Sequence, residues 1–191
     1  MGDGEPHQMS NYRRWREKGG TYFFTLATEG RLPIFAGAAA IERLRHCRRV
    51  EHRRHPFELM AAVVLPDHLH CLIRLPDGDD DFSMRHKQFK TCVTRRHLFA
   101  GGAEAEVSAS KLMRKERGVL QRHFWELLCR DDDDIKRHLD YIHWNPAKHG
   151  FAKSHMDWRC SSFRRWVRLG DYEPDWGPGG NIHIDIPSEF D

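Results

Sequence analysis

The stretch that decides the fold is AAVVLPDHLHCLI, residues 61–73, in which a Pro-Asp turn and two histidines interrupt an apolar run. The short turn predicts a hairpin, with an antiparallel strand on either side of it. Successive side chains of a strand point to opposite faces, so His68 and His70 share one face while Leu69 and Cys71 share the other. One face of the second strand is therefore apolar, and the other presents two imidazoles.

The two histidines allow two interpretations. Neutral imidazole nitrogens are good metal ligands, and a strand would hold His68 and His70 side by side as half of a site for a divalent cation. The simpler alternative is that both rings end a strand beside a turn and only form hydrogen bonds. The rest of the chain has to decide between the two.

Length and composition predict one cytoplasmic domain. The chain has 191 residues, of which 39% are hydrophobic and 31% charged, which suits a single core. No apolar run approaches the roughly 20 residues that span a bilayer, and the first residues lack a secretory signal, so we expect no membrane partner. The five cysteines stand singly, without a Cys-x-x-Cys pair. That spacing argues against a zinc ribbon or a disulfide framework and predicts buried free thiols.

The net charge of +3 hides two basic segments. Residues 13–55 contain eleven Lys and Arg against four Asp and Glu, and residues 82–122 contain ten against three. Clustered cations suit a polyanion such as nucleic acid, and an ordinary solvated surface is the alternative. The candidate phosphate contacts are Arg13, Arg14 and Arg16 in the N-terminal arm, Arg45, Arg48 and Arg49 in the first helix, and Lys90 in the second.

The pattern along the chain predicts a ferredoxin-like sandwich, an α+β fold with the element order βαββαβ. Its antiparallel sheet has helices on one face, and a tyrosine-bearing helix follows the fourth strand. The predicted strands cover residues 21–27, 57–64, 68–73 and 123–129, and the predicted helices cover 37–54, 81–99 and 135 onward. Around them we expect a basic arm (1–20), one catalytic domain (21–169) with a flexible loop (about 100–118), and a loosely ordered tail (170–191).

The last helix carries a polar side next to its buried stripe. Acidic residues 131–134 are expected to cap its free amides rather than to bind metal. Pro146 is expected to end or kink the helix, and Gly150 offers a stop one turn later. Tyr141 and Asn145 lie one turn apart on the same side. A tyrosine can attack phosphorus when a cation stabilises its phenolate, and the strand histidines together with Asn145 could hold that cation. The alternative is a half-buried helical aromatic without a chemical role.

Several segments resemble one family of DNA-processing enzymes. PDHLH, residues 66–70, resembles the histidine-hydrophobic-histidine motif of the single-tyrosine transposases. RHFWE (122–126) and HLDYIHWNPAKHG (138–150) resemble the tyrosine-helix segment of the members associated with repetitive extragenic palindromes (REP). Trp158 and SSF (161–163) are similar to the C-terminal block of that family.

The resemblance extends over residues 12–166 and implies a ferredoxin-like domain that cleaves and rejoins single-stranded DNA at or near hairpins. By this similarity Tyr141 forms a 5′-phosphotyrosine link and leaves a 3′-hydroxyl. His68 and His70 bind Mg²⁺ or Mn²⁺, and Asn145 takes the place of the polar residue that completes the metal site. The implied partner is single-stranded or hairpin DNA in the nucleoid, and monomer and homodimer both stay open.

Two other functions compete with this one. A non-catalytic ferredoxin-like module would bind hairpin DNA or RNA in a salt-sensitive way, would ignore metal and would tolerate loss of His68. A small metallohydrolase or metal-binding regulator would bind metal and have no affinity for hairpins.

Overall fold

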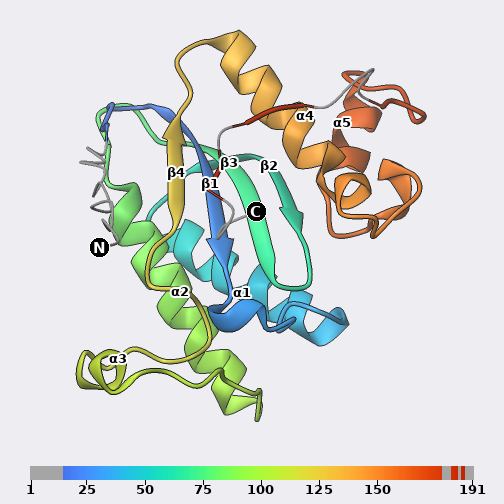
Figure 1. Ribbon diagram of the computed structural model, residues 1–191. Coiled ribbons are helices and arrows are strands. Elements are labelled where there is room, and N and C mark those ends of the chain that lie inside the picture. The colour runs from blue at the N-terminus through green and yellow to red at the C-terminus, as the bar shows by residue number, and fades with distance from the viewer. Residues whose placement is uncertain (1–14, 178–181, 185, 188–191) are drawn as a thin grey trace, which may run out of the picture.

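The computed structural model describes residues 15–177, 182–184 and 186–187. Most of the predicted N-terminal arm, including Arg13 and Arg14, lies outside the described residues. The sheet has four strands in the order β2-β3-β1-β4, and every neighbouring pair is antiparallel (Figure 1). Its strands are β1 (Thr21–Ala27), β2 (Glu58–Val64), β3 (His68–Arg74) and β4 (Trp125–Leu128).

Helices cover both faces of this sheet (Figure 1). One face is covered by α1 (Ala38–Arg54) and α2 (Phe82–Phe99), and the other by α4 (Asp132–Lys148) and α5 (Phe163–Leu169). The short helices are η1 (Glu29–Arg31), α3 (Ala109–Met113) and η2 (His155–Asp157). The predicted βαββαβ order and the α+β class are confirmed, with α4 as the tyrosine-bearing helix. No helix of the described residues is both long and apolar enough to span a membrane.

Strand β1 separates two hydrophobic clusters. All seven of its residues are buried, because the strand is central and is covered on both faces. Tyr22 and Phe24 belong to the cluster under α1 and α2. Phe23 belongs to the cluster under α4, together with Tyr141 and Ile142. Successive residues of β1 therefore contact opposite clusters, as the two-residue period of a strand requires.

Helix α4 is capped as predicted, but it begins at Asp132 and not at residue 135. The Asp131 carboxylate accepts a hydrogen bond from the Asp134 N–H at 2.8 Å and caps the first turn. The helix does not end at Pro146 and continues to Lys148, close to the stop that we predict at Gly150. Proline removes one N–H donor, yet its own carbonyl accepts from the Phe151 N–H at 2.8 Å. The last turn therefore keeps other backbone bonds across the proline.

The expectation of free thiols is wrong for two cysteines. Cys47 on α1 and Cys92 on α2 form a disulfide, with their Cα atoms 5.7 Å apart. They are 45 residues apart in sequence, so only the packing of the two helices reveals that their side chains meet. Cys71, Cys129 and Cys160 are free.

Two segments that we predict to be flexible contain packed residues. In the loop 100–118 the Ala105 N–H donates to the Gly118 carbonyl at 2.7 Å. A Cβ at Gly118 would lie 1.9 Å from the Ala105 oxygen, so this close approach requires glycine. In the tail, Tyr172 is 6% exposed.

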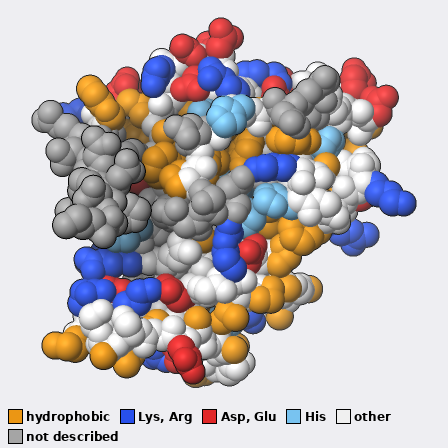
Figure 2. Space-filling view, in the orientation of Figure 1, with side chains coloured by type: hydrophobic (Ala, Val, Ile, Leu, Met, Phe, Trp, Pro, Cys, Tyr) orange, Lys and Arg blue, Asp and Glu red, His pale blue; other side chains and the backbone are white. Residues whose placement is uncertain are grey.

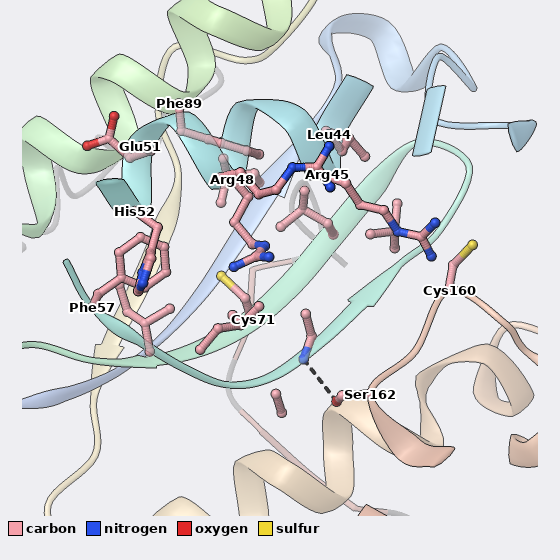
Figure 3. Close-up of a pocket in the computed structure, with 18 of the residues that line it drawn as sticks. Leu44, Arg45, Arg48, Glu51, His52, Phe57, Cys71, Phe89, Cys160 and Ser162 are labelled. Carbon is pink, nitrogen blue, oxygen red and sulfur yellow. Dashed lines mark hydrogen bonds between the residues drawn. The ribbon is translucent and has the colours of Figure 1, made fainter. Parts of the chain in front are cut away.

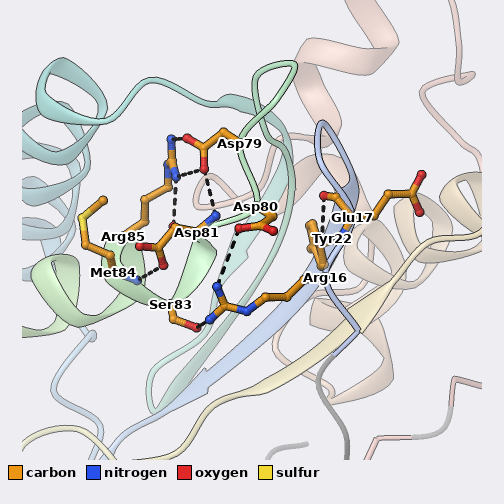
Figure 4. A network of polar contacts seen from close by, with 9 residues as sticks. All are labelled: Arg16, Glu17, Tyr22, Asp79, Asp80, Asp81, Ser83, Met84 and Arg85. Atoms are coloured by element: carbon orange, nitrogen blue, oxygen red, sulfur yellow. Dashed lines mark hydrogen bonds and ion pairs between the residues drawn. The ribbon is translucent and has the colours of Figure 1, made fainter.

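A polar network fixes the start of α2 (Figure 4). The Arg85 guanidinium donates to the Asp79 carboxylate at 2.6 and 3.2 Å and lowers the pKa of that carboxyl. Asp81 caps the helix by accepting from the Met84 N–H at 3.0 Å. Arg16 donates to the Ser83 hydroxyl at 3.2 Å, so the described end of the predicted arm lies against α2.

Candidate functional site

Strand β3 brings His68 and His70 together on the α4 face of the sheet. Their ring centroids are 5.0 Å apart, and the two side chains are 2% and 0% exposed. Burial lowers the pKa of His68, against the opposing effect of Asp67. The imidazole is therefore neutral near pH 7, which is the form that binds metal.

Each histidine is oriented through its Nδ1. The His68 Nδ1–H donates to the Asp67 carboxylate at 2.7 Å, and the His70 Nδ1 lies 2.7 Å from the Thr25 hydroxyl. A ligand histidine is commonly held in this way through the nitrogen that does not face the metal. In both rings Nδ1 is thus engaged, and Nε2 is the nitrogen through which a metal would be bound.

Helix α4 places Tyr141 next to this pair. The Tyr141 and His70 rings meet edge to face with their centroids 5.4 Å apart. The Lys148 ammonium donates to the Tyr141 hydroxyl at 3.0 Å. Residues 141, 145 and 148 recur at helical spacing on one side of α4, so the helix presents phenol, amide and ammonium together.

The candidate site contains buried polar atoms that lack hydrogen-bond partners and that could bind a cation. Asn145 is fully buried, and within the described part of the chain neither its Oδ1 nor its Nδ2 has a hydrogen-bond partner. The same holds for His68 Nε2. Leaving such groups unsatisfied costs roughly 1–3 kcal/mol each. Imidazole nitrogen suits transition metals such as Zn²⁺, and amide oxygen suits Mg²⁺ and Mn²⁺, so the predicted donor set can hold a divalent metal without selecting one ion.

Sequence reasoning missed two residues of this site. Lys148 contacts Tyr141 as described, and His149, which caps the end of α4, lies with its ring centroid 5.3 Å from that of His68. Both belong to the segment 138–150 that carries the family resemblance. The i+7 spacing from Tyr141 could have indicated Lys148, whereas His149 depends on how the helix ends.

A second group of potential ligands lies at the start of α4. Ligand atoms of Cys129, Asp134 and His138 all lie within 4.8 Å of one another. The Cys129 sulfur is 3.7 Å from His138 Nδ1, and burial raises the pKa of the thiol to about 12. Thiolate, imidazole and carboxylate are ligands that zinc accepts. From the sequence we predict that acidic residues 131–134 only cap the helix. In the structure Asp134 also belongs to this group of potential metal ligands.

The predicted DNA contacts lie away from the histidines and Tyr141. Arg45, Arg48 and Arg49 project from α1 on the opposite side of the sheet, where all three line one cavity. Lys90 on α2 donates to the carbonyls of Gln121 and Arg122. In the view of Figure 2, Lys and Arg side chains gather around α2.

Comparisons with known proteins show the family of the chain. No family model matches the chain. The Escherichia coli REP-associated tyrosine transposase is 40% identical over 168 residues, which cover 88% of this chain and 91% of the relative. A Haemophilus influenzae protein that carries the same family name is 39% identical over 176 residues, 92% of this chain and 98% of the relative.

A solved structure extends the comparison to three dimensions. It is that of a REP-associated tyrosine transposase bound to a REP hairpin. It matches with a TM-score of 0.74 and 37% identity, and the match covers 92% of this chain and 94% of that one. The chain belongs to the REP-associated tyrosine transposase family.

Proposed function

We propose that this protein cleaves and rejoins single-stranded DNA at or near hairpin sequences, with Tyr141 as the nucleophile and a divalent metal held by His68, His70 and Asn145. The observation that carries the proposal is the contact between Tyr141 on α4 and His70 on β3. Two elements distant in sequence thereby place a phenol beside an imidazole pair. The family membership supplies hairpin DNA as the substrate class, because the solved relative is bound to a REP hairpin.

The proposed step is a transesterification. The Tyr141 oxygen attacks a phosphorus atom of the DNA, a tyrosyl O–P bond forms, and the P–O3′ bond breaks. The phenol loses its proton and the departing 3′ oxygen gains one, so a 5′-phosphotyrosine and a 3′-hydroxyl result. Rejoining is the reverse reaction with another 3′-hydroxyl.

Protein groups around Tyr141 favour this step. The Lys148 ammonium at 3.0 Å stabilises negative charge on the phenol oxygen. Asp67 and Thr25 orient the two imidazoles through their Nδ1 atoms. When bound, Mg²⁺ or Mn²⁺ would withdraw charge from the phosphate oxygens and stabilise the leaving 3′ oxygen.

The DNA would be held by cations outside the catalytic residues. The proposed phosphate contacts are Arg13, Arg14, Arg16, Arg45, Arg48, Arg49 and Lys90. Two of these, Arg13 and Arg14, lie outside the described residues. Phosphate contacts fix the position of DNA on a protein without reading its sequence.

The test is formation of a covalent adduct. The protein is incubated with Mn²⁺ and hairpin oligonucleotides from the native genome, and products are separated under denaturing conditions. We expect a protein–DNA adduct, and mass spectrometry should place the modification on Tyr141. Tyr141→Phe should abolish the adduct without lowering the melting temperature, and Tyr172→Phe is the matched control on the far side of α4.

Two results would contradict the proposal. An adduct that persists in Tyr141→Phe would exclude this nucleophile. Salt-sensitive hairpin binding that ignores metal and gives no adduct with any oligonucleotide would support the non-catalytic binding module instead.

A further inference from the structure

Cys129, Asp134 and His138 form a compact group where β4 leads into α4. Cys129 directly follows β4, and Asp134 and His138 lie one helical turn apart on α4. One ligand atom from each residue lies within 4.8 Å of the other two. The Phe23 ring contacts both this group and the candidate catalytic site, with its centroid 4.9 Å from that of His138 and 5.5 Å from that of His70. The two groups are therefore neighbours that share no ligand.

The distances within this group suit the ligands of one tetrahedral ion. Cys129 Sγ lies 3.7 Å from His138 Nδ1, and the same nitrogen lies 3.4 Å from Asp134 Oδ1. Zinc bonds of about 2.3 Å to sulfur and about 2.0–2.1 Å to nitrogen or oxygen place two tetrahedral ligand atoms roughly 3.3–3.6 Å apart. Two of the three distances thus match a single zinc ion, and the third lies within the 4.8 Å of the group.

Burial limits the contact of this group with water. Cys129 and His138 are 7% and 4% exposed. His138 Nδ1 lies 2.7 Å from the Asp134 carbonyl, but in a regular helix this carbonyl also accepts the backbone N–H of residue 138. An ion bound to Nδ1 would therefore leave the carbonyl paired. Among the described residues His138 Nε2 has no hydrogen-bond partner, so the protein alone does not satisfy this imidazole.

Backbone groups hold two of the three ligands. The Arg130 N–H donates to Asp134 Oδ2 at 3.1 Å, which leaves Oδ1 for the rest of the group. Burial raises the pKa of the Cys129 thiol, and a backbone hydrogen bond from Phe23 opposes this effect. The Arg137 guanidinium lies 3.6 Å from Asp134 Oδ1, but an exposed arginine forms only a weak pair in water. Such outer contacts orient the ligands of metal sites.

We propose that Cys129, Asp134 and His138 bind one zinc ion, which joins the end of β4 to the start of α4. Thiolate favours Zn²⁺ over Mg²⁺, and Zn²⁺ accepts sulfur, nitrogen and oxygen ligands together. Water would complete the fourth position. Tyr141 follows His138 by about one turn, so the ion would fix the helix that carries the candidate nucleophile. The site supplies no group to the proposed reaction and does not depend on it.

Cobalt is a probe that distinguishes this site from the candidate catalytic site. Co²⁺ can replace Zn²⁺ in a tetrahedral site, and a bond between cobalt and thiolate absorbs in the near ultraviolet. The catalytic candidates His68, His70 and Asn145 offer no sulfur, so an ion bound there gives no such band. The full chain, with its disulfide intact, is titrated with Co²⁺ in the absence of oxygen and added thiols. We expect the band to rise to saturation and to disappear when Zn²⁺ is added.

Three variants test the assignment of the ligands. Cys129→Ser should abolish the band. Asp134→Asn, whose amide oxygen can still accept from the Arg130 N–H, should weaken Co²⁺ binding about tenfold or more. Cys160→Ser is the matched control and should keep the band, because Cys160 is a free cysteine that lines a cavity on the opposite face of the sheet (Figure 3). Circular dichroism verifies that each variant folds. Absence of the band in the unaltered protein, or its survival in Cys129→Ser, would overturn the proposal.

Zinc should also stabilise the folded chain. A ligand that binds only the folded state raises its stability, so saturating Zn²⁺ should raise the melting temperature of the unaltered protein and of His70→Gln by several degrees. Cys129→Ser should show no rise. An equal rise in Cys129→Ser would place the stabilising ion elsewhere and overturn the link between β4 and α4. If the cobalt band appears but no Tyr141 adduct forms, the zinc site stands and only the proposed function fails.

Discussion

The two faces of β3 differ in chemistry although they belong to one strand. Its even-numbered side presents His68 and His70 to α4, where polar groups are buried at short range. Its odd-numbered side presents Leu69, Cys71 and Ile73 to α1 and to a wide groove with arginines. The α4 face is closed and polar at its centre, and the α1 face is open and cationic at its rim. In our proposal this division lets a single strand position the metal ligands on one side and contact substrate on the other.

Removing a ligand from the α4 face should have the largest effect. At saturating hairpin and Mn²⁺, His70→Gln should slow adduct formation about 1,000-fold, because one imidazole of the proposed metal site is lost. Quench-flow with denaturing gels measures the rate. His97→Gln is the matched control, since His97 is a buried histidine on α2 whose bond to the Ala103 carbonyl an amide can replace. If His70→Gln and His97→Gln slowed adduct formation equally, the two faces of the sheet would not differ in their importance for cleavage.

Breaking the disulfide on the α1 and α2 side of the sheet should lower the stability of the protein. Cys47 and Cys92 join α1 to α2, and a crosslink that closes a loop of this length stabilises a protein by roughly 4 kcal/mol. Cys92→Ala should therefore lower the melting temperature by several degrees and leave the adduct rate at saturating DNA within twofold. Scanning calorimetry gives the first value, and the adduct assay gives the second. A loss of rate at unchanged stability would contradict this expectation.

Lys148 should contribute less than the metal ligands. Lys148→Met removes the cation 3.0 Å from the Tyr141 hydroxyl, and we expect a rate about tenfold lower, or ~1.4 kcal/mol. The loss should shrink at high pH, where hydroxide can take the phenol proton, and Lys148→Arg should restore most of the rate. A loss that is equal at every pH would indicate a purely structural role.

The smallest expected effect is a decrease in the free energy of unfolding at low pH, caused by a buried histidine on the α4 face. Burial lowers the pKa of His143 to about 3, against about 6.5 in an unfolded chain. Between these values the unfolded state binds a proton that the folded state does not, so the free energy of unfolding falls as the pH falls. We expect a loss of about 1 kcal/mol between pH 7 and pH 5.5. His143→Gln, whose amide can still bond Ser162, should remove this part of the slope in urea titrations.

The fold and the relative placement of the candidate site residues could be predicted because they depend on local periodicity. Alternation placed His68 and His70 on one face, and helical spacing placed Tyr141 with Asn145. The continuation of α4 through Pro146 could not be predicted, because it depends on bonds that the following loop supplies. The Cys47–Cys92 pair and the groove also escaped prediction, since both arise only where separate elements pack against each other. Lys148 lay within the quoted motif, where only its i+7 spacing from Tyr141 pointed to it.

The separation of Tyr141 from the strand histidines has a consequence for synthesis of the protein. A ribosome that has completed β3 still has to translate about 70 residues before the codon for the nucleophile. In our proposal a nascent or truncated chain that ends before α4 carries the two strand histidines but not the nucleophile. The host chromosome would then meet a cutting enzyme only after translation has passed α4.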